Sequence, residues 1–174
     1  KGALSNVQAA VTSVENWSRE NRMKLHPGKC KELIVDFSKN KHVFDPIMVD
    51  GVCIPVVSKA NVLGLTISNN LLWNDHVTET IKKANKRLYS LVLLKRAGVP
   101  LMDIKNFYCA TIRPVLEYCS PVFHHALPQY LSAEIERVQK RALSIMNPGH
   151  TYEANLVQFG LATLHKRRQE LCDN

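Results

Sequence analysis

The side chains best suited to chemistry in this sequence are basic, and they recur at helical spacing between residues 81 and 96. There are six: Lys82, Lys83, Lys86, Arg87, Lys95 and Arg96. Lys82 and Lys86 are four residues apart, as are Lys83 and Arg87, and Lys95 is adjacent to Arg96. Like charges four residues apart cost an isolated helix roughly 0.2–0.5 kcal/mol per pair. A phosphate backbone would relieve that repulsion and release counterions. The spacing therefore predicts a nucleic-acid-binding face, with a solvated helix face as the alternative.

No self-contained catalytic site accompanies these cations. The six aspartates are scattered without an Asp-Asp pair, whereas two-metal nucleotidyl transfer needs carboxylates that hold ions about 3.5–4 Å apart. The sequence also lacks a glycine-rich phosphate loop, a nucleophile elbow and a His-Glu-x-x-His motif. Glu134 and Glu136 fall on different faces of a helix, which indicates a solvated surface. We expect no catalytic residue, bound metal or cofactor in this chain.

The cysteines give no sign of a disulfide framework. There are five, irregularly spaced and without a Cys-x-x-Cys pair, which favours reduced thiols in an intracellular compartment, nucleus or cytoplasm. The nearest approach to a zinc site is Cys109, Cys119, His124 and His125, and this spacing does not match that of known zinc ligands. No apolar run reaches the roughly 20 residues of a membrane span.

The net charge of +8 is concentrated in the middle of the chain. Residues 78–133 hold 8 basic and 3 acidic side chains, so +5 of the +8 lies there. A focused basic surface favours a polyanionic partner. We expect nucleic acid first and an anionic membrane surface second.

The first 72 residues should supply a helix and a small antiparallel β unit. Leu4, Val7, Val11, Val14 and Trp17 form one stripe of a helix over residues 3–22. His26-Pro27-Gly28 should end that helix. Three β segments are expected after it. The first is a strand at 31–37 with Leu33, Val35 and Phe37 on one face. The second is a hairpin at 47–57 around Asp50-Gly51, in which Pro55 should make the second arm an edge strand or end it early, and the third is a β-prone run at 61–67.

From Trp73 onward the apolar period changes from two to about 3.6, which predicts a helical bundle. Gly98 and Pro100 should end the first helix, Pro114 should kink or divide the second, and Ser132 should cap the third. The expected helices cover residues 75–97, 101–118, 131–146, 152–159 and 161–172. The fold class is therefore α+β, with two regions, 1–72 and 73–174.

Several segments, taken in order, resemble the part of non-LTR (LINE-type, jockey-like) retrotransposon reverse transcriptases that follows the catalytic aspartates. VENWSRENRMKLHPGKCKELIVDF (14–37) is similar to motif D, and VLGLTISNNLLWNDHV (62–77) to the primer-grip region. The segments that resemble thumb helices are IKKANKRLYSLVLLKRAGV (81–99), FYCATIRPVLEYCSPVF (107–123) and IERVQKRALSIM (135–146).

This resemblance implies a palm edge followed by a thumb, which holds template–primer nucleic acid. Lys29 or Lys31 would match the motif-D lysine near the leaving pyrophosphate, with an exposed pair beside a turn as the alternative. Leu63-Gly64 would match the primer grip, with a β-bulge at Gly64 as the alternative. The basic residues between 82 and 96 would lie along the template–primer backbone. The family's aspartates and their Mg²⁺ belong to a palm expected upstream of residue 1, so the chain is expected to bind duplex without catalysing nucleotide transfer. That missing palm is a second expected partner.

Two alternatives stay open. The chain could be a non-catalytic interaction module that docks a partner through the apolar faces of residues 102–118 and 131–146. A narrower similarity links residues 82–99 to the N-terminal helical segment of an AlkB-type tRNA-modifying enzyme, although the iron ligands of that family are not recognisable here.

Overall fold

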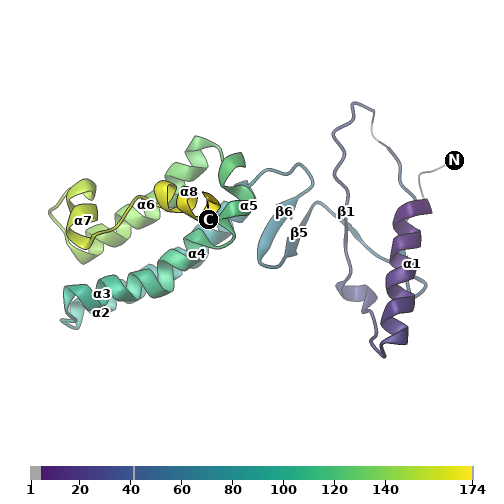
Figure 1. Cartoon of the computed structure of the whole chain (residues 1–174), viewed down its shortest axis with the longest axis horizontal. Helices are drawn as coiled ribbons and strands as arrows, with labels where there is room; N and C mark the ends of the chain where they lie inside the picture. The colour runs from purple at the N-terminus through teal and green to yellow at the C-terminus, as the bar shows by residue number, and fades with distance from the viewer. Residues whose placement is uncertain (1–4, 41, 174) are drawn as a thin grey trace. The chain divides into compact units, whose positions relative to one another are not determined.

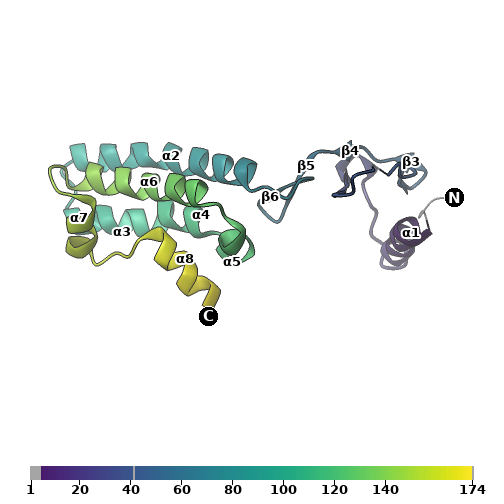
Figure 2. The ribbon, with the colours of Figure 1, turned by 90° about the horizontal axis from the view of Figure 1, so that it is seen from above.

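The computed structural model describes residues 5–40 and 42–173, and the chain divides after Leu72 into two compact units, residues 1–72 and 73–174. Figures 1 and 2 show a first unit of one helix and short strands and a second unit made of helices. The predicted α+β class is confirmed.

The first unit begins with α1 (Ser5–Glu20), which ends earlier than the Pro-Gly signal predicted. Arg22 takes a left-handed backbone (φ 56°), and the Met23 amide donates back to the Ser18 carbonyl at 2.7 Å. This turn ends the helix before His26 is reached. Of the predicted stripe, Leu4 lies outside the described residues, and Val7, Val14 and Trp17 are about half exposed. The apolar face of α1 is therefore formed but largely uncovered.

Side chains of α1 hold the helix against the strand that follows Ile47. The Gln8 amide donates to the Met48 carbonyl at 3.0 Å and accepts from the Met48 amide at 2.9 Å. The Glu15 carboxylate accepts from the Asp50 amide at 2.6 Å. These bonds use backbone groups that a neighbouring strand would otherwise pair, so α1 covers this edge of the hairpin.

The strand predicted at 31–37 is much shorter, because the chain turns away within it. β1 (Glu32–Leu33) pairs in parallel with β4 (Val56–Val57). Beyond it, the Asp36 carboxylate accepts from the Ser38 and His42 amides, a local turn that competes with strand pairing. Val35 and Phe37 are exposed as a result.

Two hairpins make up the remaining β structure. β2 (Met48–Val49) and β3 (Val52–Cys53) are joined by Asp50-Gly51, both with positive φ, as the sequence predicted. β3 ends before Pro55, also as predicted. The run at 61–67 is a second hairpin, of β5 (Lys59–Val62) and β6 (Leu65–Ser68), in which Val62 pairs with Leu65.

The second unit is built around α2 (Asn74–Arg96) and α6 (Gln129–Met146), which lie side by side (Figures 1 and 2). The turn that follows α2 passes through Gly98 (φ 73°), as predicted, and the Val99 amide donates to the Leu94 carbonyl there. The predicted stripes of both helices meet in the core. Its fully buried members include Val77, Ala84, Leu91, Ile104, Ile112, Leu116, Ile135, Ala142 and Leu143.

Pro114 divides the second predicted helix through a change of winding. The segment consists of α3 (Leu101–Phe107), a π-helical turn η2 (Tyr108–Ile112) and α4 (Arg113–Glu117). Proline cannot donate to the carbonyl four residues earlier, and a wider turn just before it accommodates that loss.

Shorter helices complete the second unit: α5 (Ser120–Phe123), η3 (His124–Ala126), α7 (Tyr152–Phe159) and α8 (Leu164–Asp173). α6 begins three residues before Ser132, so the predicted cap is wrong. The Ser132 hydroxyl instead accepts from Arg168 Nη2 at 2.7 Å. Among the described residues, no helix combines the length and apolar character that crossing a membrane requires.

Candidate nucleic-acid interface

The 23-residue helix α2 carries the predicted basic residues on faces turned away from its apolar stripe. Ala84, Leu88 and Leu91 are buried against the other helices, whereas Lys82 and Lys86 are exposed. Because residues four apart share a helix face, these two lysines present their charges in one direction. They form the outward basic edge of α2.

The other pair, Lys83 and Arg87, lies on the side of α2 that meets η2. Lys83 is exposed, but the Arg87 guanidinium donates from Nη1 to the Thr111 carbonyl. The π-helical winding of η2 disturbs the regular pattern of carbonyl acceptors there. The Arg87 side chain therefore links α2 to η2 through this hydrogen bond.

Lys95 does not project into solvent as the sequence predicted. Its ammonium donates to the carbonyl oxygens of Ile145 at 2.8 Å and Met146 at 3.0 Å. These carbonyls end α6, where the helix dipole favours a cation. Lys95 is a structural cap in this unit, while its neighbour Arg96 remains exposed.

The structure adds two arginines that the sequence analysis did not select. A groove of about 270 Å³ between α2 and α6 is lined by Ile81 and Asn85 from α2 and by Arg137 and Arg141 from α6, together with Glu134 and Val138. The two arginines are four residues apart, a spacing that could have identified them. They bring positive charge from a second helix to the side of α2.

Two tyrosines of the second unit, Tyr89 and Tyr108, could stack on bases if they were accessible. Tyr89 is exposed on α2. Tyr108 is fully buried, its hydroxyl donates to Gln139 Oε1 at 2.6 Å, and burial raises its pKa well above 10. Only Tyr89 of this pair could contact a ligand.

The candidate motif-D lysines lie in the first unit beside the short helical turn η1 (Pro27–Lys29). Lys29 ends this turn and Lys31 precedes β1, and both are exposed. Exposure is expected both for lysines that act near a pyrophosphate and for an ordinary solvated pair beside a turn, so it does not distinguish the two.

Leu63 and Gly64 form the tip of the β5–β6 hairpin rather than a strand or a bulge. Both have positive φ, 49° and 86°, and the Gly64 amide donates to Asn61 Oδ1 at 3.2 Å. Positive φ at both central positions defines the turn type that matches strand twist, and it is unfavourable for leucine. The Leu63 side chain is 85% exposed. A strained, apolar and exposed hairpin tip is a candidate contact point.

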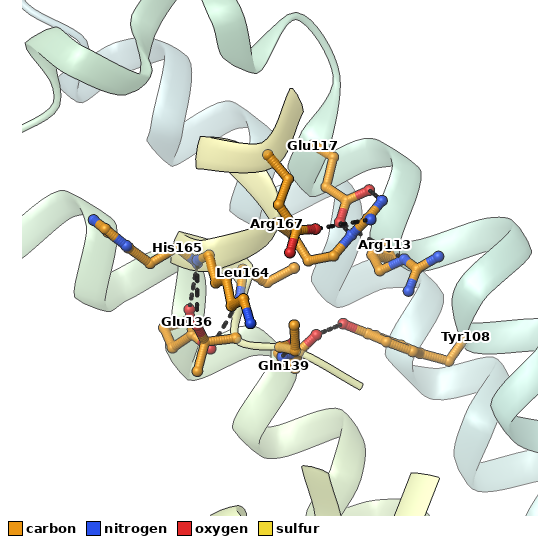
Figure 3. A network of polar contacts seen from close by, with 12 residues as sticks. Tyr108, Arg113, Glu117, Glu136, Gln139, Leu164, His165 and Arg167 are labelled. Carbon is orange, nitrogen blue, oxygen red and sulfur yellow. Dashed lines mark hydrogen bonds and ion pairs between the residues drawn. The ribbon is translucent and has the colours of Figure 1, made fainter. Parts of the chain in front are cut away.

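Glu136 is part of a partly buried polar network and not a solvated surface residue (Figure 3). Its carboxylate accepts from the amides of Leu164 at 3.1 Å and His165 at 3.2 Å, which caps the N-terminus of α8. The Tyr152 hydroxyl donates to the same carboxylate, and burial followed by this bond raises the Tyr152 pKa. Glu136 thereby joins α6, α7 and α8.

The network continues through Gln139 and Glu117. Gln139 is fully buried and donates to the Tyr152 hydroxyl at 2.8 Å and to the Ala162 carbonyl at 3.0 Å. Arg167 donates to Glu117 at 3.2 Å, which raises the Arg167 pKa, and Arg113 lies 3.7 Å from the same carboxylate (Figure 3). These contacts fix α8 on the unit and engage both arginines with the Glu117 carboxylate.

Trp73 and His76, which lie within the segment similar to the primer-grip region, form an aromatic cluster with Phe123 at the start of α2. The His76 ring is 5.9 Å from Trp73 and 5.1 Å from Phe123, centroid to centroid. Burial lowers the His76 pKa, and the charge of Lys83 lowers it further against an opposing effect of Glu79. The cluster secures α5 to α2.

No group of three or more His, Cys, Asp or Glu side chains in the described residues is placed to hold a metal ion. The cysteines at the positions considered for zinc, Cys109 and Cys119, are free thiols.

Comparison with known proteins gives one informative similarity. The chain is 22% identical over 143 residues to a probable RNA-directed DNA polymerase from transposon BS of Drosophila melanogaster. The match covers 81% of this chain and 16% of that protein, so the chain spans well under two thirds of its relative. No protein-family model matches the chain. No solved structure matches it either.

This similarity supports the resemblance to mobile-element reverse transcriptases that the sequence motifs indicated. It gives no support to the similarity of residues 82–99 to AlkB-type enzymes.

Proposed function

We propose that this chain derives from a mobile-element reverse transcriptase and corresponds to a part that holds nucleic acid, without the residues for nucleotide transfer. The similarity to a transposon polymerase over 81% of the chain supports the origin. The scattered aspartates support the absence of transfer chemistry. The catalytic Mg²⁺ and its ligands would then belong to another part of such a polymerase.

One observation carries the binding proposal: the exposed lysines of α2 lie on a well-packed helix beside a groove edged by Arg137 and Arg141. Lys82, Lys83 and Lys86 supply charges that phosphates can neutralise at little cost in side-chain packing. The preferred partner is a template–primer duplex, contacted through its backbone. Leu63 at the hairpin tip is proposed as an additional contact near the primer end.

The interaction-module alternative loses the surface it required. The apolar faces of residues 102–118 and 131–146 pack against each other and α2, with Ile104, Ile112, Ile135 and Ala142 at most 2% exposed. A partner could not reach these faces without unfolding the unit.

The binding proposal is tested by fluorescence anisotropy with a labelled RNA–DNA duplex over a range of salt concentrations. The variant is Lys82→Ala/Lys83→Ala/Lys86→Ala. The matched control, Lys24→Ala/Lys39→Ala/Lys166→Ala, removes the same charge from exposed lysines elsewhere. We expect the α2 variant alone to flatten the slope of log K against log salt by roughly 2–3, about 0.9 per lost phosphate contact. Equal losses in the two variants would contradict a localised interface.

The non-catalytic part of the proposal has its own test. The chain is incubated with primer–template, Mg²⁺ and deoxynucleotides, and no primer extension is expected. Extension that survives repurification and follows the protein peak would overturn this part and leave the binding proposal untouched.

A further inference from the structure

The groove of about 270 Å³ between α2 and α6, two helices that lie side by side in Figure 2, holds charges of both signs. Arg137 and Arg141 line it, and so does Glu134, which precedes Arg137 by about one turn of the same helix. A track for phosphates alone gains nothing from a carboxylate, because like charges at short range repel. The groove therefore suits a ligand with hydrogen-bond donors at one end and an anion at the other.

None of these three side chains forms an ion pair with another residue in the part of the chain that the structure describes. A glutamate three residues before an arginine commonly pairs with it on a helix surface, but Glu134 and Arg137 do not pair here. Elsewhere in the unit, Glu117 engages both Arg113 and Arg167. The two groove arginines are exposed and Glu134 is half-buried, so all three side chains remain available to a ligand.

The uncharged lining of the groove is mostly aliphatic. Val138 is 4% exposed and Ile81 is half-buried, and Asn85 adds one amide from α2. An aliphatic surface edged by a few polar groups accepts the face of a flat ring and fixes its orientation. The groove is smaller than the roughly 300–1,000 Å³ of pockets that enclose a drug-sized ligand, so a single ring system is enough to fill it.

The charges are spread along α6 over a distance that one nucleotide can span. Residues 134 and 141 are about two turns apart, which at 1.5 Å per residue is about 10 Å along the helix axis. Glu134 and Arg141 can thus meet opposite ends of one nucleotide, the edge of its base and its phosphate. Arg137 lies between them on the same side of the helix.

A carboxylate discriminates among the four bases. Guanine alone presents two adjacent donors on its Watson–Crick edge, N1–H and the N2 amino group, and the two oxygens of a carboxylate match this pair. Adenine and cytosine place a ring acceptor beside their single amino group, and uracil flanks its one N–H with two carbonyl oxygens. In a duplex, guanine gives both donors to cytosine, so only an unpaired guanine can offer them to the protein.

We propose that the groove between α2 and α6 binds one unpaired guanine nucleotide of a single strand. Glu134 accepts from N1–H and the N2 amino group, Arg137 donates to O6, and Arg141 pairs with the phosphate of the same nucleotide. One face of the base packs on Ile81 and Val138. The inference rests on the proposed function for its class of ligand, nucleic acid, and adds a preferred base and an unpaired strand to it.

The test measures binding of the full chain by fluorescence anisotropy to short labelled oligouridine strands whose central residue is guanosine, inosine or adenosine. We expect the guanosine strand to bind at least about fivefold more tightly than the adenosine strand. Inosine lacks the N2 amino group and should fall between them. Annealing each strand to its complement should abolish the difference. Equal binding of the guanosine and adenosine single strands would overturn the proposal and would favour a ligand of another class, such as a peptide of mixed charge.

Variants locate the effect. Glu134→Gln keeps the size of the side chain but replaces one acceptor oxygen with a donor, so the preference for guanosine should disappear. The adenosine strand should bind this variant at least as tightly as before, because a charge that repels phosphate is gone. Glu153→Gln changes the net charge equally at an exposed position of α7 outside the groove, and should keep the preference. A folded Glu134→Gln protein that still prefers guanosine, or that loses affinity for both strands in parallel, would refute base recognition by Glu134.

Recognition of the phosphate is tested separately. Arg141→Gln should weaken binding of the guanosine and adenosine strands by the same factor, since both carry the phosphate. A loss confined to the guanosine strand would contradict the role given to Arg141.

The lysines of α2 separate this inference from the duplex proposal. The Lys82→Ala/Lys83→Ala/Lys86→Ala variant should weaken both single strands by the same factor and keep the ratio between them. An unchanged salt dependence of duplex binding in that variant, with the guanosine preference intact, would refute the duplex interface alone. A normal duplex result without any guanosine preference would refute the groove alone.

Discussion

The ammonium of Lys95 lies 2.8 Å from the carbonyl oxygen of Ile145, so the last turn of α2 closes the C-terminal end of α6. A second bond to the Met146 carbonyl completes this cap. A residue that the sequence assigned to ligand binding thus holds together the two longest helices of the unit.

Replacing Lys95 tests whether its main role is structural. Lys95→Met keeps the aliphatic stem and removes both hydrogen bonds, so we expect the free energy of unfolding to fall by about 1–2 kcal/mol. Urea unfolding followed by helical circular dichroism gives this value. Arg96→Met, the neighbouring exposed cation, should change stability by less than about 0.5 kcal/mol. A large loss of duplex affinity in a stable Lys95→Met protein would restore its predicted role in binding.

Removal of the Glu136 carboxylate should loosen α8. Glu136→Leu leaves the Leu164 and His165 amides and the Tyr152 hydroxyl without their acceptor, a cost of roughly 1.5–3 kcal/mol. Hydrogen exchange should accelerate at Leu164 and His165 before it does in α2. Glu134→Leu, two residues away on another face, should leave the exchange of both amides unchanged. Unaltered protection in the Glu136 variant would mean that α8 is held by packing alone.

Mild acid should destabilise the second unit through its buried histidines. The pKa values of His76 and His124 are lowered in the folded chain, mainly by burial. Below their ordinary value of about 6.5 the unfolded chain therefore binds more protons than the folded chain. Their contribution to stability is complete above that pH and is lost as the pH falls toward the lower folded values. The urea concentration at the midpoint of unfolding should therefore fall as the pH is lowered from 8 to 5.

His76→Phe tests this assignment, because a phenyl ring can pack against Trp73 and Phe123 without taking up a proton. The variant should show a shallower loss of stability with acid, whereas the exposed His150→Gln should follow the original curve. A His76→Phe curve identical to that of the unmodified protein would exclude His76 as a source of the acid sensitivity.

The β5–β6 hairpin should become more stable when the strained residue in its turn, Leu63, is replaced. Leu63→Asn places a residue that tolerates positive φ at a position where leucine is strained, and should stabilise the hairpin by roughly 1 kcal/mol. Gly64→Ala, at φ 86°, should destabilise it by a similar amount. Amide exchange at the cross-strand partners of β5 and β6 measures both effects. If Leu63→Asn also weakens duplex binding, the leucine is retained for contact rather than for folding.

Periodicity was sufficient to predict the helices of the second unit, because their stripes are buried against one another. The stripe around Val77, Ala84 and Leu88 and that around Ile135, Val138 and Ala142 end up in one core. In the first unit, the alternation of apolar residues did not predict the length of the first strand. The strand expected at 31–37 has a two-residue partner in β4, and the Asp36 carboxylate draws the chain into a turn instead.

In the candidate site, too, local sequence predicted which side chains are exposed but not which distant groups they contact. Exposure of Lys82 and Lys86 followed from their position opposite an apolar stripe. The partners of Lys95 and Arg87 lie 50 and 24 residues further along the chain, and no local pattern could reveal them. Glu136 was misassigned for the same reason, since its partners are the amides of a helix that begins 28 residues later.

The π-helical turn η2 has a consequence for how related chains should compare with this one. A turn closed by i to i+5 bonds holds about one residue more than an α-helical turn. A relative that crosses this segment in uninterrupted α-helix would need one amino acid fewer between Tyr108 and Ile112 to keep Ile104 and Leu116 on the same buried side. Deleting Ala110, which is exposed, should therefore be better tolerated than deleting a residue from the middle of α2. The wider turn would thus allow the helix to gain or lose one residue here without moving the buried core.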